Sequence, residues 1–355
     1  MPGYLVLENG KVFKGKLLND CLISEGEVVF STAMVSYQDI ITDPSYYGQI
    51  VVMTYPLVGN VGFNEKSFAS NRAMVKGLVL REATDFPSHY EMEVDLISFL
   101  NKSEIPVLTE VDTRALTRFI RKHGIMGGVI THSLNNMDLL IKRAKNAKEN
   151  MQGDIVQFVT RSNFMKFGLG DKKIVMLDLG TKRGVINSLV RRDSTVIIVP
   201  AHTSYDEIIR LNPQGVILSD GPGDPQIIPY VIKTGRALIG KVPLFGIGLG
   251  HQVLALALGA KTYKLDYGHR GSNQAVKDLD TNRIYITTQN HGFCIDENSL
   301  KETAIEVTMR NLNDNTIEGI RHKDLPISSV QFDPEGYPGY SDTGFFYDDF
   351  LEICL

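Results

Sequence analysis

One stretch of the sequence has the spacing of a catalytic turn. Residues 245–252 read Phe-Gly-Ile-Gly-Leu-Gly-His-Gln and lie between an apolar run and a predicted helix over 253–258. This spacing is that of a nucleophile elbow, in which flanking glycines let a strand turn sharply into a helix. Backbone N–H groups at the start of such a helix can stabilise an oxyanion. The tip of the elbow is Gly248, which has no side chain, so the sequence predicts the geometry of a covalent catalyst without its reactive group.

The elbow is expected at the end of a strand in a parallel sheet. Apolar runs at 173–178, 195–200, 215–219 and 242–247 predict short buried strands, and helical stretches such as 204–211 lie between them. Strands that alternate with helices indicate an α/β fold with a mostly parallel sheet covered on both faces. Ligands bind at the carboxyl ends of the strands in such sheets, which is where the elbow falls.

The first half of the chain has a different pattern. Short strand-like runs with turn signals, such as Asn9-Gly10, are followed by helical segments at 112–123 and 137–148, which predicts a smaller mixed α+β domain. Glycines then become frequent and the apolar pattern loosens. We therefore predict an N-terminal domain over 1–150, a linker over 151–171 and a C-terminal domain over 172–355.

Composition narrows the classes of function. The 355 residues are 43% hydrophobic and 22% charged with a formal net charge of -4, so we expect neither nucleic acid nor a membrane as a partner. No apolar run approaches the ~20 residues of a membrane span, and the first residues do not resemble a signal peptide. Cys21, Cys294 and Cys354 are few and scattered, which favours neither a disulfide framework nor a zinc site. A reducing cytoplasm is the expected location.

Several motifs together resemble one family, the class I (triad-type) glutamine amidotransferases, and in particular the small subunits of carbamoyl-phosphate synthetases. The elbow resembles that family's G-I-C-L-G-H-Q. Residues 219–225 (Ser-Asp-Gly-Pro-Gly-Asp-Pro), 267–273 (Tyr-Gly-His-Arg-Gly-Ser-Asn) and 288–293 (Thr-Gln-Asn-His-Gly-Phe) resemble its oxyanion loop and two further motifs. Residues 42–46 and 54–60 resemble the small subunit's own N-terminal domain. The resemblance covers nearly the whole chain and implies the same two domains.

The catalytic positions depart from the family pattern. The resemblance implies a cysteine that attacks the glutamine amide, a histidine that moves the proton and a glutamate that orients the histidine. Gly248 stands at the cysteine position, and the family's Q-x-H-P-E reads Gln-Phe-Asp-Pro-Glu here, with Asp333 at the histidine position and Glu335 retained. Asp220 and Gln274 replace an asparagine and a histidine of the family. We do not expect Cys294 to act as a substitute nucleophile.

The resemblance also implies a glutamine pocket. Its expected residues are Ser45, Gly221, Gly223, Leu249, Gln252, Asn290, Gly292 and Phe293. His251, His269 and His291 lie inside family motifs, so we expect structural hydrogen bonds from them and no metal site. The stretch 337–340 is predicted to be a surface loop near the pocket.

By resemblance, intact relatives hydrolyse glutamine and pass ammonia to a large subunit, which uses ATP, Mg²⁺ and bicarbonate to make carbamoyl phosphate for arginine and pyrimidine synthesis. We expect the large subunit and L-glutamine as partners and no cofactor in this chain, which lacks a phosphate-binding G-x-x-x-x-G-K-[ST] motif. Three readings remain open. They are a glutaminase-deficient subunit that supports an ammonia-dependent synthetase, a working glutaminase with an unforeseen nucleophile or a sequence altered from an active parent, and a glutamine-binding regulatory pseudo-amidotransferase without a catalytic task.

Overall fold

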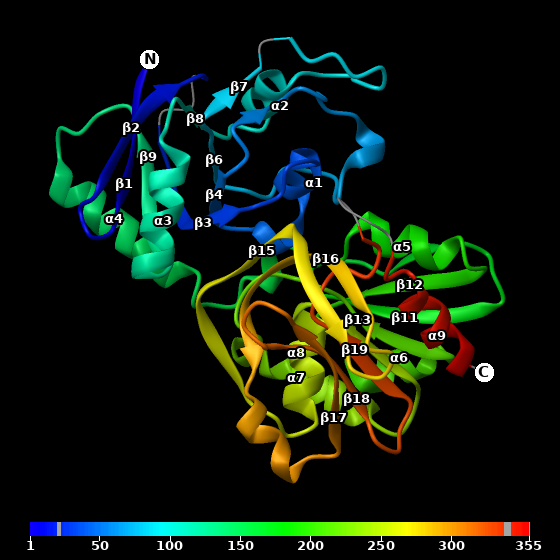
Figure 1. The fold of residues 1–355 in the computed structure, drawn as a ribbon. Helices are drawn as coiled ribbons and strands as arrows, with labels where there is room; N and C mark the ends of the chain where they lie inside the picture. The colour runs from blue at the N-terminus through cyan, green and yellow to red at the C-terminus, as the bar shows by residue number, and fades with distance from the viewer. Residues whose placement is uncertain (20–22, 85, 337–341, 355) are drawn as a thin grey trace. The chain divides into compact units, whose positions relative to one another are not determined.

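The computed structural model describes residues 1–19, 23–84, 86–336 and 342–354. The chain divides into two compact units, Met1–Gly153 and Asp154–Leu355 (Figure 1). The stretch 337–340, predicted to be a surface loop, lies outside the described residues. No helix in the described ranges is long and apolar enough to cross a membrane.

The N-terminal unit is built on a closed barrel. Its strands, in order around the barrel, are β1 (Pro2–Leu7), β2 (Val12–Leu17), β8 (Val107–Thr109), β6 (Gly77–Val79), β4 (Gln49–Met53), β3 (Ile23–Ser31) and β9 (Met126–Thr131). The predicted hairpin at Asn9-Gly10 joins β1 to β2 in antiparallel register. Gly10 has a φ of 82°, a conformation that glycine adopts without strain.

Helices and short segments complete this unit. They are α1 (Tyr37–Thr42), α2 (Leu96–Lys102), α3 (Thr113–His123), α4 (Met137–Asn150), the 3-10 turns η1 (Pro44–Tyr46) and η2 (Glu65–Ser67), and the paired strands β5 (Leu57–Val58) and β7 (Glu82–Ala83). The side chains of Asp112 and Asn136 cap α3 and α4 by accepting hydrogen bonds from backbone N–H groups of the first turn. Leu140 and Ala144 of α4 pack against Val6 and Val129 of the barrel.

The C-terminal unit contains a ten-stranded sheet. Its order is β10 (Met165–Phe167), β12 (Ser194–Pro200), β11 (Lys172–Asp178), β13 (Gly215–Leu218), β14 (Leu244–Ile247), β19 (Ile327–Val330), β18 (Ile317–His322), β17 (Ile305–Asn311), β15 (Thr262–Asp278) and β16 (Ile284–Ile295). The five strands from β12 to β19 are parallel, as the apolar runs predicted for four of them. The chain therefore has the α/β class that the sequence indicated, with the predicted parallel strands forming one half of this sheet.

Helices cover both faces of the parallel strands. Side chains alternate along β11, so that Ile174 and Met176 join a core with α5 (Arg183–Val190) and α9 (Phe345–Ile353). Val175 and Leu177 face the opposite core, which contains residues of α6, α7 and α8. These helices span Tyr205–Arg210, Pro229–Leu238 and Leu249–Ala257.

Three features differ from the sequence-based expectation. Helix α8 begins at Leu249, four residues before the predicted start, because Gly248 completes the turn within a single residue. The strands β15 to β18 form an antiparallel extension that no apolar run predicted, since its members alternate buried and partly exposed residues, many of them polar. Part of the predicted linker is β10, which pairs with β12.

Candidate functional site

The elbow has the predicted geometry. Gly248 lies between β14 and α8 with φ 54° and ψ -111°, a backbone conformation that residues with a side chain rarely adopt. Its N–H donates a 3.0 Å hydrogen bond to the carbonyl of Val330 on β19, and its carbonyl accepts a 3.3 Å bond from Gln252. The turn is thus fixed from both sides although no side chain stands at its tip.

The space next to the elbow tip is filled by Asp220. A Cβ atom built on Gly248 would collide with the carboxylate of Asp220, which follows β13. The same carboxylate accepts a 3.1 Å hydrogen bond from the N–H of Leu249, the first residue of α8. A backbone donor at the place expected for an oxyanion therefore already binds an anionic side chain of the protein.

The glycines of the neighbouring loop are required by close packing. A Cβ on Gly221 would run into the carbonyl of Leu179, and Gly223 has a φ of 98°. Side chains at either position would strain the loop. The loop thus keeps the close backbone approach that the predicted pocket needs.

A buried lysine joins three carboxylates near the elbow. Lys182, only 5% exposed, forms ion pairs with the carboxylates of Asp333, of Glu335 at 3.4 Å and of Asp220 at 3.9 Å. Glu335 also accepts a 3.0 Å hydrogen bond from the hydroxyl of Tyr347 on α9. We name Lys182, Asp220, Asp333 and Glu335 the lysine cluster. One ammonium group faces three carboxylates in this cluster, so carboxylates are in excess, and Asp333 is held in an ion pair.

The sequence analysis missed Lys182. It stands just after β11, at the carboxyl end of a parallel strand, and is the residue before α5. A lysine at such a strand end was the available signal. Its partners are remote in sequence, and only the fold brings them within reach.

The predicted pocket residues on α8 and β16 are also in contact. The side-chain amide of Gln252 donates 2.9 Å hydrogen bonds to the carbonyl of Phe293 and to Gln331. Asn290, Gly292 and Phe293 are half-buried on β16. Gln252 thus links the elbow helix to the strand that carries these residues.

Ser45 belongs to the other unit. It lies in η1, and its hydroxyl donates a 2.7 Å hydrogen bond to Asp43. Its predicted role in glutamine binding stays a prediction.

The three motif histidines have different environments. Burial lowers the pKa of His251 to about 3, and its Nδ1 lies 2.8 Å from the hydroxyl of Ser329. Burial also opposes the charged form of His269, but its interactions with Asp314 and Glu318 outweigh that cost and raise its pKa to about 9. Burial and the charge of His269 hold the pKa of His291 well below its usual range.

Each of the two units matches a known protein family. The model of the carbamoyl-phosphate synthase small chain CPSase domain matches residues 5–130, and that of class I glutamine amidotransferases matches residues 175–353. The carbamoyl phosphate synthase small chain of Caldanaerobacter subterraneus subsp. tengcongensis is 44% identical over 359 residues, covering 100% of this chain and 97% of that protein. The small chain of Staphylococcus epidermidis is 45% identical over 99% of this chain and 95% of its own.

A third relative, the pyrimidine-specific small chain of Bacillus subtilis, is 44% identical over 99% of this chain and 96% of its own. Among solved structures, the chain is similar to a glutamine amidotransferase from Thermotoga maritima, with a TM-score of 0.38 and 17% identity over 47% of this chain and 77% of that one. The two family models match residues in both units, and these relatives are similar over nearly the whole chain. The chain therefore belongs to the carbamoyl-phosphate synthase small-chain family and has a class I glutamine amidotransferase domain as its C-terminal half.

Proposed function

We propose that this chain is a small subunit of carbamoyl-phosphate synthetase that has lost its own glutaminase step and supports synthesis from ammonia. In this proposal the large subunit is its partner and supplies the ATP, Mg²⁺ and bicarbonate chemistry. The complex works in the cytoplasm and serves arginine or pyrimidine synthesis. Membership of the family supports the large subunit as the partner. The altered site supports the proposed loss of glutamine hydrolysis.

The main support for a lost glutaminase step is the relationship between Gly248 and Asp220. Hydrolysis of glutamine through a covalent intermediate needs a nucleophilic side chain at the elbow tip. Gly248 has none, and the Asp220 carboxylate lies where a Cβ would be. Loss of the nucleophile in another triad enzyme costs on the order of 10⁶ in turnover.

Among the residues that the structure describes, three candidates near the site are unsuited to replace the lost pair. Asp333 is ion-paired with Lys182 and offers no imidazole for proton transfer. Lys182 is surrounded by carboxylates that favour its ammonium form, which is not a nucleophile. Cys294 is fully buried, and burial raises the pKa of its thiol well above the ordinary value. The cysteine thus stays in the unreactive thiol form.

A second candidate function rests on the pocket. Gln252 still contacts the carbonyl of Phe293, and Gly221 and Gly223 keep their close approaches. These features support a glutamine-binding regulatory subunit without catalysis. In that role, bound glutamine would favour one arrangement of the complex with the large subunit.

The deciding experiment uses the full chain purified with a large subunit. Carbamoyl phosphate formation is measured with glutamine or with ammonium chloride as the nitrogen source. We expect synthesis from ammonium and none from glutamine. Glutamine-dependent turnover of about 1 per second, an ordinary enzymatic rate, would show that the glutaminase is intact. A regulatory role predicts that glutamine changes the ammonium-dependent rate.

A further inference from the structure

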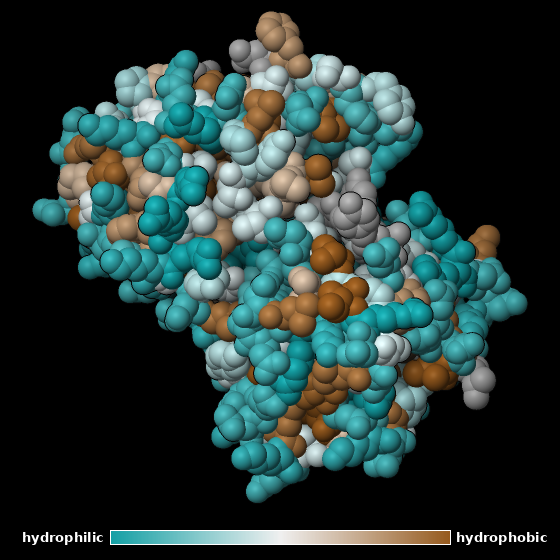
Figure 2. Space-filling model, in the orientation of Figure 1, coloured by the Kyte–Doolittle hydropathy of each residue, from teal (hydrophilic) through white to brown (hydrophobic). Residues whose placement is uncertain are grey.

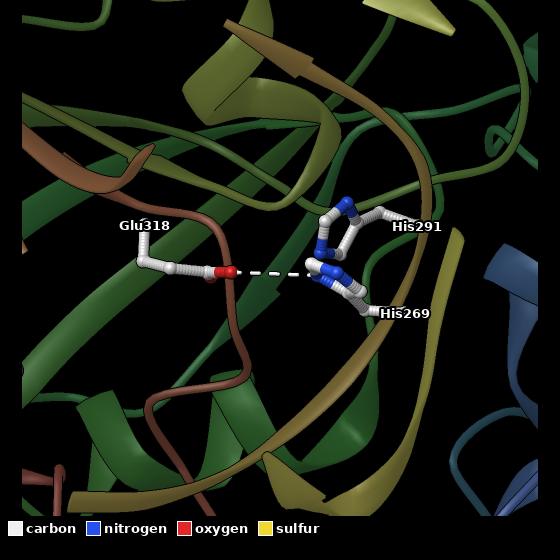
Figure 3. A group of neighbouring side chains, drawn as sticks. All are labelled: His269, His291 and Glu318. Carbon is white, nitrogen blue, oxygen red and sulfur yellow. Dashed lines mark ion pairs between the residues drawn. The ribbon is translucent and has the colours of Figure 1, made fainter. Parts of the chain in front are cut away.

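Three buried side chains converge on one point in the antiparallel part of the C-terminal sheet. His269 on β15 and His291 on β16 are direct cross-strand partners, and Glu318 comes from β18. All three are buried, and each offers an atom that lies within 4.8 Å of the atoms offered by the other two. Figure 3 shows the two imidazole rings on one side and the Glu318 carboxylate pointing toward them from the other.

In each of these side chains, one atom faces the other two side chains and is here called the inner atom. The outer atoms, which point away from the cluster, already have hydrogen-bond partners. Nε2 of His269 lies 2.7 Å from the carboxylate of Asp314, and Nδ1 of His291 lies 2.9 Å from the carbonyl of Phe293. Gln289 donates a 3.0 Å hydrogen bond to one oxygen of Glu318. Histidines that bind metals almost always donate their second ring N–H to a carboxylate or a backbone carbonyl. The cluster therefore has the supporting interactions of a metal site.

The atoms that face one another are bound less completely, although one oxygen of Glu318 accepts a 3.2 Å hydrogen bond from Asn311. Nδ1 of His269 is buried and makes no hydrogen bond to the part of the chain that the structure describes, and its ion-pair contact with Glu318 is 3.5 Å long. Nε2 of His291 faces the side-chain oxygen of Gln289 at 3.1 Å, while its Nδ1 faces the Phe293 carbonyl. A neutral imidazole carries one N–H and cannot donate to both oxygens. One ring nitrogen of His291 therefore retains a lone pair.

We propose that His269, His291 and Glu318 bind a divalent transition-metal ion through their inner atoms, with zinc as the best fit. Two imidazoles and one carboxylate are an established zinc ligand set, and imidazole nitrogen selects transition metals over Mg²⁺ or Ca²⁺. The ligand atoms are Nδ1 of His269, Nε2 of His291 and a carboxylate oxygen of Glu318. Zinc would displace the proton from Nδ1 of His269, and that proton would go to solvent.

An acidic pocket adjoins the cluster through Asp314. Its volume is about 470 Å³, and its lining includes Asp296, Glu297 and Asp314. Asp314 also contacts His269, so it connects the pocket to the inner site. The ion would join β15, β16 and β18 at the strand that carries Asn290 and Gly292. It would thus hold in place the strand on which the proposed glutamine-binding residues lie.

Zinc chloride added to the chelator-treated full-length chain tests this site directly. We expect uptake of about one zinc ion per chain, measured by elemental analysis, and visible absorption when cobalt(II) replaces zinc. Glu318→Gln keeps the shape of the side chain and should weaken zinc binding by more than about 100-fold. Asp314→Asn changes only a supporting contact and should weaken it about 10- to 100-fold. His202→Gln removes an exposed histidine of the same unit and should leave binding unchanged.

Circular dichroism establishes that each variant is folded. Should Glu318→Gln fail to fold, His291→Asn removes another inner ligand and should weaken zinc binding by a similar factor, whereas Asp314→Asn, whose side chain is 40% exposed, reports only on the outer contact. A folded wild-type chain that takes up no stoichiometric zinc would overturn the proposal. Undiminished uptake in the Glu318 and Asp314 variants would also overturn it. Loss of zinc in Asp314→Asn alone would place the ion in the outer pocket and contradict the inner site.

Discussion

The Asp220 carboxylate and a side chain at position 248 exclude each other. A substitution at position 248 should therefore lower the stability of the chain. Gly248→Cys should destabilise it by about 1–3 kcal/mol, because the new Cβ must displace Asp220 and the cysteine backbone must keep a positive φ. Urea denaturation measures the effect. Gly248→Ala is the matched control and should cost a similar amount, since both variants add the same Cβ. A Gly248→Cys variant as stable as the wild type would contradict the assignment of this space to Asp220.

Restoring glutaminase activity should require several changes together. Gly248→Cys alone still lacks a base, because Asp333 is ion-paired with Lys182. The double variant Gly248→Cys with Asp333→His should gain much more activity than the sum of the two single variants. Adding Asp220→Asn should raise the glutaminase activity further. This substitution introduces the asparagine that the family motif implies at this position and removes a carboxylate from the elbow.

Coupled detection of glutamate measures these activities in the full complex. Full activity of the single cysteine variant would show that Asp333 does not occupy the base position.

Lys182 should be essential for stability near neutral pH. Lys182→Met keeps the apolar stem but leaves the carboxylates of Asp220, Asp333 and Glu335 without their shared counter-charge. Removing one partner from a buried ion pair typically costs 3–5 kcal/mol, so we expect a loss of roughly that size. Lys233→Met, at an exposed position of α7, is the control and should change stability little. Equal effects of the two substitutions would refute the role of the cluster.

His251 should make the folded state sensitive to acid. Burial lowers its folded pKa to about 3, whereas its ordinary value is 6.5, so the unfolded chain takes up a proton first as the pH falls. The contribution of the neutral ring to the free energy of unfolding is therefore complete above pH 6.5 and is lost as the pH falls toward 3. The loss amounts to about 2 kcal/mol at pH 5.

The loss of stability between pH 7 and pH 5 should thus be smaller in His251→Asn than in the wild type. His202→Asn, which alters an exposed histidine, should leave the loss unchanged. Identical pH profiles for wild type and His251→Asn would be inconsistent with a buried neutral ring.

Glutamine should still bind, weakly. Binding needs the shape and donors of the pocket, of which Gln252 and Gly221 keep their positions. The excess of carboxylates in the lysine cluster opposes an anionic group, so we expect a Kd of about millimolar, or roughly -4 kcal/mol. Calorimetry on the complex with the large subunit measures it. Gln252→Ala should abolish the heat, while Gln157→Ala, at an exposed position, should not. No heat at several millimolar glutamine would mean that the pocket no longer binds it.

Local patterns explain what the sequence predicted correctly. The parallel strands appear as apolar runs, and the elbow appears as closely spaced glycines, so both can be read within about ten residues. The closure of the N-terminal barrel depends on distant pairings such as Ile23 with Thr131, which no local pattern contains. The lysine cluster was missed for the same reason. Its charges come from the ends of separate strands, and a lysine read alone is expected at the surface.

The position of Asp220 also makes substitutions at two positions depend on each other. In its present orientation the Asp220 carboxylate leaves no room for a Cβ at position 248, so any side chain there requires the carboxylate to move. Leu249 and Lys182 both bind that carboxylate, so the arrangement opposes a side chain at the elbow. The effect of a substitution at position 248 therefore depends on the residue at position 220, and we expect the two positions to change together.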